Sequence, residues 1–170
     1  MSVVNLVRPI HEGVVAGWTL PTNYLQGDLP DWYGKALGDA ALLVDGEEVV
    51  FADGYATGQH DEDHTAHLLI FTKSLLVAVV AETIGGEVSR TTLAHRRSDL
   101  VQLGVQTGVS ALADHFGNVK WPGRVTVELS YKGGQSYALP SAGSGSTYHA
   151  AERMQDFIPS LRRDLLSDSV

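Results

Sequence analysis

Residues 59–67 are the part of the sequence whose residue types are best suited to binding a metal ion, and they read Gln-His-Asp-Glu-Asp-His-Thr-Ala-His. If this segment is extended, His60, Glu62 and His64 share one face, because alternate residues of a strand point the same way. Two imidazoles and a carboxylate suit zinc or another divalent cation, and His67 is a further candidate ligand. The segment can also be read as a polar loop between two strands. Both interpretations stay open.

A second group of residues is basic and suits an anionic ligand. Its members are Lys73, Arg90, His95, Arg96 and Arg97. A hairpin turn with Lys73 and a neighbouring strand with Arg90 would both approach the turn at residues 95–97. A lipid headgroup or an acidic peptide would suit such a pocket. The alternative is a solvated turn whose charge Asp99 offsets.

The sequence offers no convincing nucleophile. Its cysteine count of 0 excludes thiolate catalysis, disulfides and cysteine-based metal centres. Residues 143–146 match neither a nucleophile elbow nor a phosphate-binding loop. His11 and His115 are isolated from other candidate groups. We therefore assign no catalytic residue and no cofactor other than the zinc-type ion above, and the sequence favours a protein that is not an enzyme.

The acidic charge balance bears on the class of partner. The formal net charge is −8, whereas a chain that binds DNA or RNA over its surface carries a basic footprint. The most apolar stretch, residues 68–81, is interrupted by a polar triplet and is shorter than a membrane-spanning helix. Residues 1–10 lack the pattern of a secretory signal. We expect a cytoplasmic protein with no transmembrane segment and no nucleic-acid partner.

Strand-like patterns dominate the middle of the chain. They occur at residues 45–55, 66–71, 75–81, 87–94, 100–105, 125–131 and 136–139. The second and third form a predicted hairpin around Thr72, Lys73 and Ser74, although a single long helix could also be drawn through them. Val125, Val127, Leu129 and Tyr131 alternate with polar residues, which predicts a half-buried antiparallel strand.

Helical patterns flank these strands. Apolar residues recur at spacings of three and four over residues 150–165, which predicts an amphipathic C-terminal helix capped by Ser146 or Thr147. A short helix capped by Asp31 is expected over residues 32–43. Ahead of it, residues 14–20 are expected to form an extra strand or a packed loop. The chain is long enough for one domain, so we expect a single domain over residues 1–170, with residues 1–44 as an N-terminal extension and 45–170 as the core.

The order of these elements resembles the bacterial pleckstrin-homology-like family. The resemblance rests on residues 46–50 (Gly-Glu-Glu-Val-Val), the hairpin at 68–77, the strand at 123–131 and the closing Phe-Ile-Pro-Ser-Leu at 157–161. It implies an α+β, mainly β fold. In that fold a bent antiparallel sheet or partly open barrel of about six or seven strands is closed by the C-terminal helix.

The resemblance says little about function, since one fold hosts many activities. The leading expectation is a non-enzymatic binding or self-assembly module that contacts protein through its sheet edges and its N-terminal extension. A metal-binding or metal-dependent protein that uses residues 60–67 is the first alternative. A binder of an anionic lipid or acidic ligand through Arg90, Arg96 and Arg97 is the second.

Overall fold

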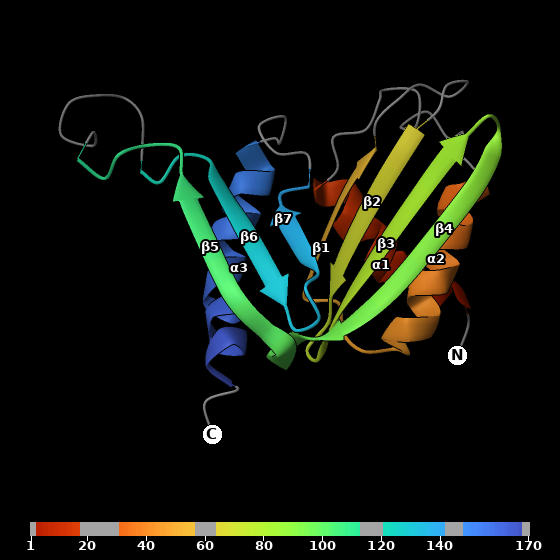
Figure 1. Ribbon diagram of the computed structural model, residues 1–170, viewed down its shortest axis with the longest axis horizontal. Coiled ribbons are helices and arrows are strands. Elements are labelled where there is room, and N and C mark those ends of the chain that lie inside the picture. Colours follow the sequence, from red (N-terminus) through yellow and green to blue (C-terminus); the bar gives the residue numbers. More distant parts are fainter. Residues whose placement is uncertain (1–2, 18–30, 57–63, 113–120, 142–147, 168–170) are drawn as a thin grey trace. The chain divides into compact units, whose positions relative to one another are not determined.

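The computed structural model describes residues 3–17, 31–56, 64–112, 121–141 and 148–167, and contacts divide the chain into two compact units, Met1–Arg97 and Ser98–Val170. The described elements of the first unit are α1 (Val3–Gly17), α2 (Asp31–Val44), β1 (Phe51–Ala56), β2 (His64–Phe71), β3 (Leu75–Ile84) and β4 (Glu87–Arg96). A 3-10 turn, η2 (Arg97–Asp99), lies at the boundary. The second unit holds β5 (Leu100–Thr107), β6 (Val125–Tyr131), β7 (Ser136–Leu139) and α3 (Tyr148–Ser167) (Figure 1).

The expected α+β, mainly β class is confirmed. The strands of the described residues form an antiparallel sheet of four and another of three, and they do not close into a barrel. The C-terminal helix and the short helix near the N-terminus are also present. Each of the two units is compact by itself, and a single domain over residues 1–170 stays a prediction.

The sheet of the first unit is a simple meander in the order β1-β2-β3-β4. The predicted hairpin around Thr72 is confirmed, and the long-helix alternative is wrong. Gly85 and Gly86 connect β3 to β4 with φ angles of 59° and 83°. A two-residue hairpin turn of type I′ needs positive φ at both central positions, which glycine adopts at no steric cost. From this turn the register of β3 and β4 continues without a shift to Leu75 opposite Arg96.

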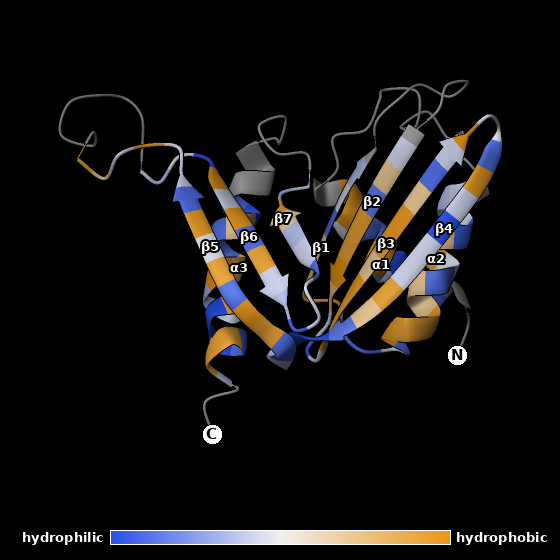
Figure 2. Cartoon of the chain, viewed as in Figure 1, coloured by the Kyte–Doolittle hydropathy of each residue, from blue (hydrophilic) through white to orange (hydrophobic). Residues whose placement is uncertain are grey.

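Helices α1 and α2 cover one face of this sheet. The residues that meet in this core come from alternate positions of the central strands and from one side of each helix. They include Ile10, Val14, Tyr33, Ala36, Ala40, Leu68, Ile70, Val77 and Val79. Figure 2 shows the corresponding hydrophobic bands along β2 and β3. His11 Nδ1 lies 3.0 Å from Tyr33 Oη, which links the two helices by a hydrogen bond.

Two sequence-based expectations near the N-terminus are corrected. Val14 lies in helix α1 and not in a strand or loop, because Leu6, Ile10 and Val14 recur every four residues and pack against the sheet. Residues 18–20 lie outside the described part of the chain. Asp45 and Gly46 follow α2 with φ angles of 47° and 79°. They therefore end that helix in the left-handed conformation typical of helix C-termini, and the strand begins only at Phe51.

The second unit follows the predicted alternation closely. The order of its sheet is β5-β6-β7, and Val125, Val127, Leu129 and Tyr131 of β6 are all buried. Helix α3 packs against β5 and β6 (Figure 1), and its residues Met154, Phe157 and Leu161 are buried. The helix continues through Pro159. The expected cap residues, Ser146 and Thr147, lie outside the described residues.

The close approach of α1 to the sheet predicts opposite effects for two helical glycines. A Cβ at Gly13 would lie 3.0 Å from the Ala52 Cβ, whereas one at Gly38 would meet nothing within 4 Å. Gly38→Ala is expected to raise the free energy of unfolding by about 0.5–1 kcal/mol through helix propensity. Gly13→Val should lower it by about 1–3 kcal/mol through overpacking. Urea unfolding followed by circular dichroism measures both, and a stabilising Gly13→Val would contradict the packing.

Candidate functional site

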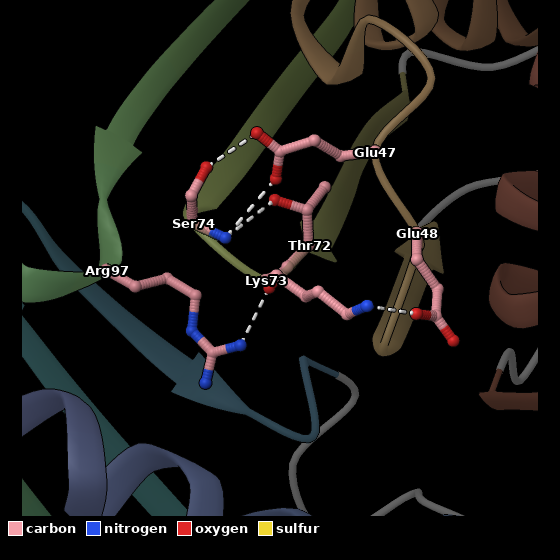
Figure 3. A network of polar contacts seen from close by, with 6 residues as sticks. All are labelled: Glu47, Glu48, Thr72, Lys73, Ser74 and Arg97. Carbon is pink, nitrogen blue, oxygen red and sulfur yellow. Dashed lines mark hydrogen bonds and ion pairs between the residues drawn. The ribbon is translucent and has the colours of Figure 1, made fainter.

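Arg97, one of the predicted ligand-binding cations, is a structural residue at the turn between β2 and β3. Its side chain is buried, and Nη1 donates a hydrogen bond to the Thr72 carbonyl at 2.7 Å. Its backbone N–H donates to the Ser74 carbonyl at 2.8 Å. Figure 3 shows the guanidinium turned toward this turn. The guanidinium of Arg97 therefore stabilises the β2–β3 turn.

Glu47 stabilises the same turn from the opposite side. The Ser74 hydroxyl donates to Glu47 Oε1 at 2.7 Å, and the Ser74 backbone N–H donates to Oε2 at 3.2 Å (Figure 3). The Leu75 N–H donates to Thr72 Oγ1 at 2.9 Å. Hydrogen bonds from the side chains of Ser74 and Thr72 hold the pKa of the Glu47 carboxyl below its ordinary value.

Two other cations of the predicted cluster are engaged in ion pairs. Lys73 Nζ lies 2.7 Å from Glu48 Oε2, and both side chains are exposed (Figure 3). Arg90 Nε donates to Asp39 Oδ2 of α2 at 3.0 Å. The structure separates Arg90 from the rest of the predicted cluster. Lys73 and Arg97 lie at the β2–β3 turn, and His95 and Arg96 end β4 beside that turn, since Arg96 pairs with Leu75. At about 3.3 Å per residue, Arg90 lies roughly 20 Å along the strand from Arg96.

The predicted metal ligands lie mostly outside the described residues. His60 and Glu62 fall within residues 57–63, and His64 is the first residue of β2. Loss of solvation lowers the pKa of His67, while the nearby Glu82 carboxylate acts in the opposite direction. Within the described ranges, no group of three or more histidine, aspartate or glutamate side chains could hold a metal ion. The metal site at residues 60–67 stays a prediction.

A pocket of about 280 Å³ lies between α1 and the segment that follows α2. Its lining residues are Asn5, Leu6, Pro9, Val44, Gly46, Glu47, Glu48 and Val49. The two carboxylates on its wall are already engaged by Ser74 and Lys73. The pocket therefore offers a ligand mainly aliphatic contacts and few polar groups for recognition.

Strand β4 is the longest and most regular of the four strands that end the two described sheets. It has ten residues without proline or glycine and pairs with β3 without a bulge. By contrast, β1 has six residues and includes Gly54, β7 has four and is followed by Pro140, and β5 contains Gly104 and a register shift near Leu100. Short strands, bulges and proline are the usual protections of a sheet edge. Strand β4 has none of these three.

The register shows which backbone groups of β4 point away from the sheet. Antiparallel pairs alternate between hydrogen-bonded and non-hydrogen-bonded types. The bond from Arg97 N to Ser74 O follows the register of β3 with β4, so the odd-numbered residues of β4 bond to β3. The closing pair of the two-residue hairpin, Ile84 and Glu87, gives the same assignment. The N–H and C=O groups of residues 88, 90, 92, 94 and 96 therefore point outward.

The side chains of β4 add apolar area and charge to this edge. Val88 and Leu93 are 46% and 44% exposed, and Ile84 at the preceding turn is 67% exposed. Arg96 is exposed and His95 is half-buried. We call residues 87–96 with these outward groups the β4 edge. The sequence indicated its cations but not Val88, Thr91 or Leu93. The uninterrupted run without glycine or proline was the available signal.

The buried hydrogen bond of Arg97 predicts a large loss of stability when it is removed. Arg97→Met leaves the buried Thr72 carbonyl without this charged donor, so the free energy of unfolding should fall by about 1.5–3 kcal/mol. Lys73→Met is the matched control, because an exposed ion pair contributes little, and its urea midpoint should equal that of the wild type. Equal midpoints for all three proteins would contradict the structural role of Arg97.

The lowered pKa of Glu47 predicts a contribution to stability that depends on pH. A carboxyl whose pKa is lower in the folded state contributes fully above its ordinary value of 4.5, and the contribution is lost as the pH falls through the lowered pKa. As the pH is lowered from 5 to the acid limit of folding, the free energy of unfolding of Glu47→Gln should therefore fall less than that of the wild type. Ser74→Ala, which removes the main donor, should flatten the profile similarly. Urea titrations at each pH measure this, and parallel profiles would contradict it.

Comparison with known proteins finds no matching family model, no matching curated protein and no matching solved structure. None of the helices in the described ranges is both long and apolar enough to cross a membrane. The functional assignment therefore rests on the geometry of the chain's own residues.

Proposed function

We propose that this chain is a non-enzymatic association module that binds an extended segment of protein along the β4 edge. The observation that carries the proposal is the ten-residue edge strand without proline, glycine or a bulge. An extended segment adds to such an edge by main-chain hydrogen bonds, while alternate side chains supply specificity.

The side chains of β4 suit this mode of binding. The exposed parts of Val88 and Leu93 offer apolar contacts, and Glu87 and Arg96 place opposite charges at the two ends of the strand. The interaction of Arg90 with Asp39 reduces the charge in the middle. A protein segment is favoured over an anionic headgroup, because Lys73, Arg90 and Arg97 already have partners.

The order of elements supports a pleckstrin-homology-like fold as part of the same proposal. A meander of four antiparallel strands is followed by three further strands and a C-terminal helix, which is the arrangement that the resemblance implied. We extend the proposal to a cytoplasmic location, since a chain without cysteine has no need of an oxidising compartment. Neither nucleic acid nor a catalytic step is part of it.

Selection of linear peptides displayed on phage tests the proposal with the whole chain as bait. Thr92→Pro removes one outward N–H without touching the bonds to β3, a change that an edge strand accepts. Peptides enriched on the wild type should bind Thr92→Pro about tenfold more weakly, which corresponds to about 1.4 kcal/mol. Thr92→Val, which keeps the N–H, is the matched control and should bind as the wild type does.

Circular dichroism establishes that each variant is folded, and Ala94→Pro removes a second outward N–H if Thr92→Pro is unstable. Peptides that bind Thr92→Pro and the wild type equally would contradict binding at the β4 edge. A selection that enriches no peptide would also count against the proposal.

A further inference from the structure

We infer that the extended segment bound by the β4 edge is β4 of a second copy of this chain, paired antiparallel about a two-fold axis at Thr91. This inference rests on the proposed function and names its partner. It would join two four-stranded sheets into one continuous sheet across the two copies.

The distribution of charge along β4 is self-complementary in the antiparallel direction. Glu87 is its first residue, and His95 and Arg96 are its last two. Antiparallel pairing of two identical strands places the acidic start of one beside the basic end of the other, twice in the same interface. Opposite charges across strands stabilise the pairing, and like charges destabilise it. The two β4 strands also have the same length, so nearly every residue of one strand has a partner on the other.

Symmetry restricts the register to a few choices. A two-fold axis perpendicular to a sheet pairs residues of the same face, so two opposed residues are both odd-numbered or both even-numbered. One residue therefore lies opposite its own copy, and the axis passes midway between these two copies. An axis at Arg90 sets Arg90 opposite itself, and an axis at Leu93 sets Arg90 opposite Arg96. Both arrangements oppose like charges. An axis at Thr91 or at Thr92 avoids both oppositions and overlaps nearly the whole strand, whereas an axis nearer either end of β4 pairs fewer residues.

The charges favour the axis at Thr91. This register sets Glu87 opposite His95 in both halves of the interface, so that a carboxylate can accept a hydrogen bond from an imidazole N–H. It also pairs Ser89 with Leu93, and Thr91 with itself, and threonine pairs are favourable across strands. An axis at Thr92 instead sets Val88 opposite Arg96 and Glu87 opposite Arg97, whose side chain is buried and donates to the Thr72 carbonyl.

The backbone hydrogen-bonding groups that point outward from β4 also face each other in this register. With the axis at Thr91, residue 90 faces 92 and residue 88 faces 94, and these are the residues whose N–H and C=O groups point outward. Each such pair exchanges two bonds, so the two halves together form about eight. Because one pair of edge strands buries less area than a typical stable interface, the association is expected to depend on concentration.

Single cysteines test both the partner and the register, since the chain contains no other thiol. Thr91→Cys places two thiols in a directly opposed, non-hydrogen-bonded pair about 4.5 Å apart between Cα atoms, within the range of a disulfide. Mild oxidation should give a reducible dimer. Ser89→Cys and Leu93→Cys are matched controls: each is exposed but lies about 13 Å from its own copy and should stay monomeric. A mixture of the two should cross-link.

Light scattering of the wild type provides a second measurement that needs no cysteine. The mass should approach that of a dimer as concentration rises. Thr91→Lys should remain monomeric, because it opposes two like charges at the axis while keeping every bond to β3. Circular dichroism of Thr91→Lys should match that of the wild type.

Three results would overturn the inference: a wild type that stays monomeric, no cross-link in Thr91→Cys, or equal cross-linking at positions 89, 91 and 93. If these occur while displayed peptides still require the Thr92 N–H, the β4 edge binds a different protein and only this inference fails. If the peptide selection also fails, the proposed function fails with it.

Discussion

The buried guanidinium of Arg97 fixes the end of β4 against the β2–β3 turn, and much of the first unit depends on it. Its bond to the Thr72 carbonyl and its backbone bond to Ser74 set the register at one end of the hairpin. Gly85 and Gly86 set it at the other. A slip by one residue would move every side chain to the opposite face. It would also turn the other set of amides outward, so the β4 edge exists in its present form because this register is held at both ends.

The helices cover one face of the sheet, whereas no described strand pairs with the outer edge of β4. Helix α2 packs against both β3 and β4, and Arg90 reaches across to Asp39. A charged side chain on an edge strand ordinarily discourages pairing. Here Asp39 draws the Arg90 side chain toward the helix and offsets its charge. The same contact that attaches α2 to β4 thereby weakens one protection of the edge.

Local patterns in the sequence predicted most of the elements, and the failures have physical causes. Alternation predicted β6 and a polar triplet between Val-rich runs predicted the β2–β3 hairpin, because both are properties of adjacent residues. Val14 was expected in an extra strand or a packed loop, whereas its four-residue spacing from Ile10 places it on the buried side of a helix. The basic cluster was predicted from an expected approach of Lys73 and Arg90 to the turn at residues 95–97. Strand β4 instead extends Arg90 away from Arg96, and burial commits Arg97 to the turn. The order of strands in a sheet is a non-local property, so the β4 edge became visible only in the structure.

The net charge of −8 bears differently on long-range and short-range association. Repulsion between two acidic copies is screened beyond about 8 Å at physiological ionic strength. The charges of β4 would meet at much shorter distances, where the arrangement of Glu87, His95 and Arg96 matters more than the total. The total charge therefore opposes indiscriminate aggregation of an unprotected edge, while the pattern on β4 selects one antiparallel register. An acidic chain with an open edge strand can in this way remain dispersed and still recognise a specific strand.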